Sequence, residues 1–247
     1  MVSDREAESA PCPVCGARAG RTFAPGLWPS LIEEWELSQD EASSIDRREG
    51  ESCRACGVHL RSMALGSALL RAAGHPGPLE DWVAARPSLK ILEINRAGDL
   101  TPWLARLPNH RLVQFPDVDL HSLPFADGQW DLVVHSDTLE HVEDPVKALM
   151  ECRRVLIRDG CLCFTIPIVP GRLTRRRDGM SPSYHGSEQD PLYRVVTEYG
   201  ADFWASVLQA GFRELRMVVE QWPDALALIA SSDDIRSALR PPESDIG

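Results

Sequence analysis

The stretch from Leu123 to Gly160 constrains the fold more than any other part of the sequence. A turn-type composition precedes the apolar run Asp131–Val134, which is of the kind that a parallel sheet buries on both faces. Polar residues follow the run, and Asp144-Pro145 has the composition of a helix start. The pattern predicts that this helix ends at Asp159-Gly160 and that Cys161–Ile166 is a second strand. It therefore predicts a βαβ unit with polar, ligand-facing residues at the carboxyl end of its first strand.

The same stretch closely resembles the class I S-adenosylmethionine (SAM)-dependent methyltransferases, in their type 11-like branch. The matching motifs are Leu123-Pro124-Phe125, Trp130-Asp131, Leu139-Glu140-His141-Val142, Asp144-Pro145, Arg154-Val155-Leu156 and Gly160. So many matches in one order are a specific signal for a fold. The resemblance implies an α/β, Rossmann-like, doubly wound sheet, SAM as the cofactor, and methyl transfer. A fold can outlive its chemistry, so activity requires evidence of its own.

Composition limits the remaining possibilities. The 247 residues are 43% hydrophobic, which is enough for one α/β domain with an appendage. A net charge of −11 argues against diffuse attraction to nucleic acid or to a membrane surface. No apolar run approaches the roughly 20 residues of a membrane span, and no signal peptide is recognisable before Cys12. We therefore expect a cytoplasmic protein, in which paired Cys-x-x-Cys spacing indicates a metal rather than disulfides.

Two matching cysteine knuckles stand near the amino terminus. Each can present two thiolates to one ion, and a glycine after each knuckle permits a tight turn. The expected ligands of a structural zinc ion are Cys12, Cys15, Cys53 and Cys56. Two unrelated reduced pairs are the alternative. Zinc would hold this segment against the catalytic domain or against a protein partner.

The expected organisation has four parts. Residues 1–10 form a disordered N-terminus, 11–74 a zinc-ribbon-like segment with a linking helix, 75–231 the methyltransferase domain, and 232–247 a polar tail. The linking helix is predicted over His59–Ala73, and the prolines that follow it mark the boundary. An apolar pattern from Leu31 to Leu37 predicts a short helix between the knuckles, and a helical turn is expected around Trp82.

In the resembled family, the first strand leads into an acidic residue and three spaced glycines that let the backbone approach the cofactor. Here the strand is expected over Leu89–Ile94 and Glu93 keeps the acidic place, but Asn95, Ala97 and Asp99 stand at the glycine positions. Gly98 is present, out of register. Asn95 tolerates a left-handed backbone and Ala97 is small. The cofactor contacts expected from this loop are Glu93, Asn95, Ala97 and Gly98.

The cofactor half of the sheet is predicted to be short. Only 25 residues separate Glu93 from Asp119, where two βαβ steps need roughly 50. We expect Asp99 to cap a short helix, Arg111–Phe115 to be a strand, and one helix, or a helix and a strand, of the usual set to be missing or reduced. By resemblance, Asp119 would accept from the adenine amino group beside the Leu120 backbone, and Asp117 is nearest to the ribose position. Ordinary loop carboxylates are the alternative for both.

The candidate reaction centre is His135-Ser136-Asp137, at the strand end that faces the transferred methyl group in the resembled enzymes. Methyl transfer needs alignment, and it needs a base only when the acceptor must lose a proton. His135 and His185 are the candidate bases. Alternatively, His135 and Ser136 line the cofactor pocket through backbone contacts. His141 belongs to the family signature and is a secondary candidate for substrate contact.

The sequence after Ile166 becomes irregular and locally basic. Its arginines are Arg172, Arg175, Arg176 and Arg177. Family members carry substrate lids here, and arginines beside a pocket could grip a phosphate or carboxylate; a solvated loop is the alternative. The expected substrate-side residues are Asp137, His141, Arg172, Tyr184 and His185. A helix over Thr197–Ala210 and a closing hairpin of Phe212–Val219 and Ala225–Ala230 are predicted next.

Three functions are compatible with the sequence. The leading hypothesis is a zinc-containing SAM-dependent methyltransferase that acts on a small molecule, a sugar or another biosynthetic intermediate, by O- or N-methylation. The second is a methyltransferase-like scaffold that has lost catalysis and docks a partner through its zinc segment. The third, a zinc-ribbon RNA methyltransferase, is opposed by the net charge and by the absence of a basic stripe.

Overall fold

A computed structural model describes residues 10–185 and 191–232. The predictions for 1–9 and for 233–247 lie outside these residues. None of the helices in the described ranges has the length and apolarity that crossing a membrane would require.

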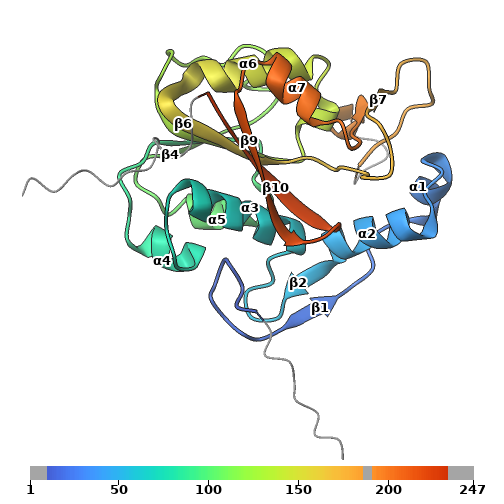
Figure 1. The fold of residues 1–247 in the computed structure, drawn as a ribbon, viewed down its shortest axis with the longest axis horizontal. Helices are drawn as coiled ribbons and strands as arrows, with labels where there is room; N and C mark the ends of the chain where they lie inside the picture. Colours follow the sequence, from blue (N-terminus) through green and yellow to red (C-terminus); the bar gives the residue numbers. More distant parts are fainter. Residues whose placement is uncertain (1–9, 186–190, 233–247) are drawn as a thin grey trace, which may run out of the picture.

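A six-stranded sheet runs through the molecule in the order β4-β3-β5-β6-β10-β9 (Figure 1). Its strands are β3 (Ile91–Ile94), β4 (His110–Val113), β5 (Trp130–Ser136), β6 (Leu156–Thr165), β9 (Glu214–Gln221) and β10 (Ala225–Ser231). The first four are parallel to one another, whereas β10 pairs antiparallel with both β6 and β9. The chain leaves β3 toward β4 on one side and returns to β5 on the other. In open α/β sheets, ligands bind at such a reversal of strand order, which lies here at the carboxyl ends of β3 and β5.

The predicted shortening of the cofactor half is confirmed. β4 is the edge strand, and residues 114–129, between β4 and β5, contain no helix or strand. The expected short helix is a single turn, α5 (Thr101–Leu104), preceded by the 3₁₀ turn η1 (Gly98–Leu100). Asp99 does not cap it: this carboxylate accepts from the backbone N–H of His59 at 2.8 Å.

Helices cover both faces of the sheet (Figure 1). α3 (Leu60–Ala72), with α4 (Leu79–Ala84) and α5, lies on one face, and α6 (Pro145–Val155) with α7 (Trp204–Gln209) lies on the other. The helix predicted over His59–Ala73 is therefore confirmed. It does not merely link two domains, because its apolar side chains share one core with Ile91, Leu132 and Cys53. The segment 11–74 and the sheet thus fold around a common hydrophobic centre.

The chain between the knuckles forms a short hairpin and two helices. β1 (Arg21–Phe23) pairs antiparallel with β2 (Glu51–Cys53), and α1 (Pro29–Glu34) and α2 (Gln39–Gly50) lie between them. α1 overlaps the short helix predicted from Leu31 to Leu37, but it ends at Glu34. α2 was not predicted, although its capping box is readable: Ser38 accepts from the Glu41 N–H, and the Glu41 carboxylate accepts from the Ser38 N–H.

Two further predicted helix boundaries were wrong, and a glycine in close backbone contact lies near each. α6 ends at Val155, and Gly160 lies within β6, where a Cβ would stand 2.8 Å from the Asp131 carbonyl oxygen. The helix predicted over Thr197–Ala210 is only α7. It is preceded by β8 (Thr197–Glu198), which pairs with β7 (Arg175–Arg176), and by Gly200, whose backbone packs directly on the Arg172 carbonyl. In both places the glycine allows two backbone segments to lie in direct contact.

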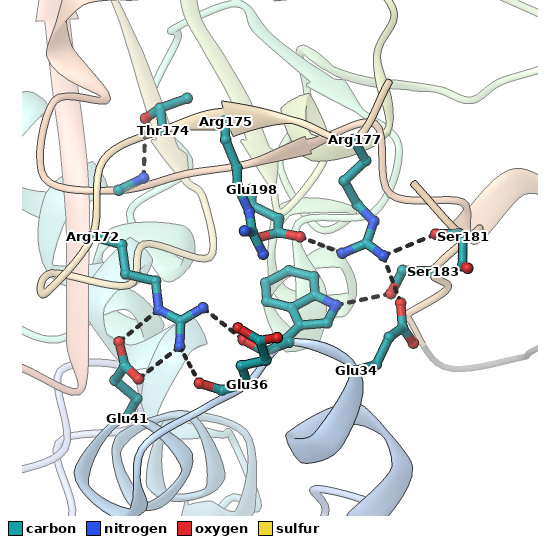
Figure 2. Close-up of polar contacts among 12 residues, drawn as sticks. Glu34, Glu36, Glu41, Arg172, Thr174, Arg175, Arg177, Ser181, Ser183 and Glu198 are labelled. Carbon is teal, nitrogen blue, oxygen red and sulfur yellow. Dashed lines mark hydrogen bonds and ion pairs between the residues drawn. The ribbon is translucent and has the colours of Figure 1, made fainter. Parts of the chain in front are cut away.

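The basic stretch after β6 is bound to the N-terminal helices (Figure 2). The Arg172 guanidinium donates to both carboxylate oxygens of Glu41, at 2.7 and 2.8 Å, and to the backbone carbonyls of Trp35 and Glu36. The buried Arg177 pairs with Glu34 and Glu198. These arginines therefore join two parts of the chain that are far apart in sequence.

Replacing Glu41 by Gln should destabilise the fold by roughly 1–2 kcal/mol at neutral pH, because a bidentate, partly buried charge-assisted contact is lost. The hydrogen bond from Arg172 lowers the pKa of Glu41 from 4.5 to about 2. The contribution of this contact to the stability of the fold is complete above about pH 4.5 and is lost as the pH falls toward 2. In urea unfolding, the difference in the free energy of unfolding between wild type and Glu41→Gln should shrink as the pH falls over that range. Glu33→Gln, an exposed carboxylate on α1, is the control.

Candidate functional site

Glu93 is fully buried and holds the loop after β3 in place. Its carboxylate accepts hydrogen bonds from the Ala97 backbone N–H at 2.7 Å, from the Thr101 hydroxyl, and from His110 Nε2 at 2.6 Å. A buried carboxylate requires such donors. Glu93 therefore shapes the loop from within.

The loop keeps a tight shape without the three glycines. Asn95 has the expected left-handed backbone, with φ +55°, and its side-chain oxygen accepts from the Phe115 N–H at 3.0 Å. Ala97 is fully buried. Gly98 has φ +56°, and a Cβ there would lie 2.6 Å from the Ser62 hydroxyl of α3. The helix preceding the sheet thus closes over this loop.

The predicted adenine and ribose carboxylates lie on the segment after β4. Asp117 and Asp119 are exposed, whereas the Leu120 side chain is buried in the core. Asp119 Oδ1 accepts from the N–H and from Nδ1 of His121, both at 2.8 Å, and the His121 N–H lowers the pKa of Asp119. His121 Nε2 in turn accepts from the Asp144 N–H at the start of α6. These contacts hold the segment beside the sheet.

A pocket of about 360 Å³ lies beside the segments that follow β5 and β6. Trp28, Leu31 and Ile45, from the chain between the cysteine knuckles, form its apolar wall. Its polar side chains come from α2, from α3, and from the loops after β5 and β6; they are Arg48, Glu49, Arg61, Asp137, Glu140, His141, His185 and Tyr193. Its volume is in the range of small-molecule sites.

The structure brings together only some of the predicted site residues. Asp137, His141 and His185 line the pocket, whereas Glu93, Asn95, Ala97, Gly98, Asp117, Asp119 and Leu120 do not. Arg172 and Tyr184 do not line the pocket either. Arg172 is hydrogen-bonded to Glu41, and Tyr184 pairs with Arg194 through a β-bridge. Sequence reasoning missed Arg61. The available signal was an arginine in the first turn of a helix whose residues are mostly apolar.

Arg61 and Asp137 form the charged centre of the pocket wall. Arg61 Nη1 lies 2.9 Å from Asp137 Oδ2 and donates to the Ser136 hydroxyl at 3.3 Å, while Nη2 lies 3.2 Å from Glu49. The Thr165 hydroxyl donates to Asp137 Oδ1 at 2.7 Å. Burial by itself would raise the pKa of Asp137, but the charge of Arg61 lowers it, so this carboxylate is ionised at neutral pH. Gly98 lies close by, since a Cβ added to it would stand 3.8 Å from Ser136 Oγ.

His135, a predicted base, does not reach the pocket. Its side chain is fully buried with its ring packed against Phe164, and no hydrogen bond to either ring nitrogen exists within residues 10–185 and 191–232. Burial lowers its pKa from 6.5 to about 3, so the imidazole stays neutral. The alternation along β5 explains the error, because neighbouring side chains face opposite sides of the sheet. His135 therefore cannot act as a base on a ligand in this pocket.

The four knuckle cysteines converge as predicted. The Sγ atoms of Cys12 and Cys56 are 3.9 Å apart and those of Cys15 and Cys53 are 3.8 Å apart, and all four lie within 4.8 Å of one another. Zinc–sulfur bonds of about 2.3 Å in a tetrahedron require sulfurs about 3.8 Å apart. The donor set therefore fits zinc. Cys152, Cys161 and Cys163 are buried in the core, as expected.

Replacing His135 by Leu should flatten the pH dependence of stability. The unfolded chain takes up a proton at this imidazole below about pH 6.5, and the folded chain only near 3. His135 therefore costs the folded state up to about 1.4 kcal/mol for each pH unit below 6.5. Thermal unfolding of the two proteins from pH 7 to pH 4 measures the difference. If the stability of wild type and of His135→Leu fell equally with pH, the burial of a neutral imidazole would be contradicted.

Residues 82–164 match the family model described as the methyltransferase domain. A malonyl-[acyl-carrier protein] O-methyltransferase of Geobacter sulfurreducens is 30% identical over 128 residues, which are 49% of this chain and 46% of that protein. A demethylmenaquinone methyltransferase of Clavibacter sepedonicus is 25% identical over 211 residues, 84% of this chain and 80% of that protein. A solved SAM-dependent methyltransferase of Thermotoga maritima, a possible histamine N-methyltransferase, shares 15% identity over 63% of this chain and 87% of its own, with a TM-score of 0.37.

The chain spans less than half of the length of two of the curated relatives that it matches. The family match lies on the stretch that contains β3, β4, β5 and α6, and it ends within β6. Residues 82–164 therefore resemble a methyltransferase domain, and they lie within a Rossmann-like α/β sheet.

Proposed function

We propose that this chain transfers a methyl group from SAM to a small-molecule acceptor bound in the 360 Å³ pocket. The observation that carries the proposal is the Arg61–Asp137 pair in the pocket wall, beside the loop that carries Gly98. The family match over residues 82–164 supports the same activity.

The charges of this wall suit the methionine end of SAM. That end carries a carboxylate, an ammonium group and a sulfonium. The Arg61 guanidinium offers charge-assisted donors to the carboxylate, and Asp137 and Glu49 offer acceptors and negative charge to the two cations. Asp119, Leu120 and Asp117 remain the proposed contacts for the adenosine end. SAM supplies an electrophilic methyl group when bound.

The rest of the pocket suits an acceptor. Methyl transfer is accelerated chiefly by holding the two reactants in line and by keeping water out. Trp28, Leu31 and Ile45 provide an apolar wall for this purpose, and His141 and His185 face the same space. Two relatives are named for small or carrier-bound acceptors, malonyl-[acyl-carrier protein] and demethylmenaquinone. A sugar or another biosynthetic intermediate remains the proposed acceptor class here.

The knuckle cysteines are proposed to hold a structural zinc ion. Four thiolates complete its shell and leave no position for water. The ion would fasten both ends of the chain that runs from β1 to β2 and carries the apolar pocket wall. Zinc would thus keep the pocket closed on one side without entering the reaction.

A methyltransferase-like scaffold is the second candidate. Asn95 and Ala97 replace glycines in the cofactor loop, and the Ser62 hydroxyl occupies space next to Gly98. In such a protein the zinc segment would dock a partner. SAM binding separates the two candidates.

Calorimetric titration of the zinc-loaded chain with SAM and with S-adenosylhomocysteine is the deciding measurement. We expect both to bind, and Arg61→Ala to weaken binding by about tenfold or more, because a charge-assisted contact is removed. Arg71→Ala, an exposed arginine of the same helix, is the matched control. If neither ligand gives heat or thermal stabilisation at millimolar concentration, the scaffold is favoured.

Removing zinc should loosen the pocket wall. A chelator, or the Cys12→Ser substitution, is expected to release zinc from the cysteines and to increase hydrogen exchange over 24–50, because the metal contributes directly to folding. Exchange within β5 should change far less. Adding zinc back should restore protection in the chelated protein. Unchanged exchange over 24–50 after confirmed zinc loss would argue against this structural role.

A further inference from the structure

Three metal-ligand side chains meet at one side of the pocket. Glu140 and His141 belong to the turn η2 (Leu139–His141) after β5, and His185 comes from the segment that carries β7. Glu140 Oε1 lies 3.5 Å from His141 Nε2 and 3.7 Å from His185 Nδ1. One ligand atom from each residue lies within 4.8 Å of the others. A single cation can therefore contact all three.

The Glu140 carboxylate has no hydrogen-bond donor in the part of the chain that the structure describes. It is fully buried, and there neither of its oxygens accepts a hydrogen bond. The charge of Arg61 acts on Glu140 without a hydrogen bond to it. A buried carboxylate without donors is disfavoured. The two imidazoles stand beyond hydrogen-bond distance, at a separation that leaves space for an ion between the groups.

The surroundings of His141 are those of a metal-binding imidazole. Its Nδ1–H donates to the Arg194 carbonyl at 2.9 Å, so the neutral ring carries its lone pair on Nε2, which faces Glu140. Such an outer hydrogen bond fixes the ring orientation of ligating histidines. The ring of His185 is packed 5.5 Å from those of both Trp35 and His141. Both imidazoles are thus held toward one point.

We propose that Glu140, His141 and His185 bind a divalent transition-metal ion in the pocket. Two imidazoles and a carboxylate suit such ions, and bonds of about 2.0–2.1 Å in a tetrahedron place ligand atoms about 3.4 Å apart, close to the distances found here. The nearby charges of Arg61 and Arg48 are balanced by Asp137 and Glu49, so Glu140 leaves the site net negative. Three protein ligands leave a coordination position open.

The open position gives the site a use, and this step rests on the proposed function. A metal ion there would lower the pKa of an acceptor hydroxyl bound at that position, so that the hydroxyl would lose its proton to solvent. Its oxygen then forms the new carbon–oxygen bond while the sulfur–methyl bond of the sulfonium breaks and leaves its electron pair on sulfur. The acceptor atom is accordingly an oxygen, and no side chain is needed as the base.

The test uses the full chain with zinc loaded at the cysteines, titrated with manganese(II) and with cobalt(II) chloride. Calorimetry and the loss of the free manganese resonance signal report the uptake. We expect one further equivalent to bind, and His185→Ala, His141→Ala and Glu140→Gln each to weaken binding by about tenfold or more. His121→Ala, a comparably exposed imidazole outside the pocket, should retain it.

Absence of uptake of both ions, or equal uptake by His185→Ala and wild type, overturns the metal site and leaves an ion pair only. Titrating the same samples with SAM separates this inference from the proposed function. SAM binding without metal uptake sinks the metal site alone. Metal uptake that the histidine variants lose, without SAM binding, supports the metal site and sinks the methyltransferase proposal.

Discussion

The burial of α3 between the sheet and the cysteine knuckles is the constraint on which the rest of the structure depends. Ten of its 13 residues are buried. It packs on Ile91 and Leu132 of the sheet and on Val14 and Cys53 of the knuckles. A helix that is apolar nearly all round must be covered on every side. The knuckle segment is therefore part of the domain core, although it precedes the stretch that matches the family model.

Two polar residues in the first turn of this helix contribute to the site. Arg61 and Ser62 point toward the carboxyl ends of the strands, where Arg61 meets Asp137 and the Ser62 hydroxyl accepts from the Asp99 N–H. Through them, a helix that precedes the stretch matched by the family model shapes both the loop after β3 and the pocket. The partly buried charge of Arg61 is balanced by the carboxylates of Asp137 and Glu49. The same helix therefore provides both the packing and the charge of the site.

The chain between the knuckles closes the pocket because it is fastened at several points. β1 and β2 hold its ends beside the cysteines, and ion pairs from Arg172 to Glu41 and from Arg47 to Asp224 hold its middle to distant parts of the chain. The basic stretch thus serves a purpose other than gripping an anion. Arg172 and Arg177 bind Glu41 and Glu34 (Figure 2), and so hold α1 and α2, the helices that carry Leu31 and Ile45 of the pocket wall.

The sequence by itself determined the features that depend on local patterns: the βαβ unit around β5 and α6, the helix α3, the short cofactor half, the closing hairpin and the convergence of four cysteines. Each follows from periodicity, turn chemistry or spacing within a few tens of residues. Only the tertiary structure decided the site. It turned His135 into the core, bound Arg172 to Glu41, and brought Arg61, Glu140 and His185 to one pocket. These outcomes depend on which strand face and which distant segments meet, and long-range packing settles that.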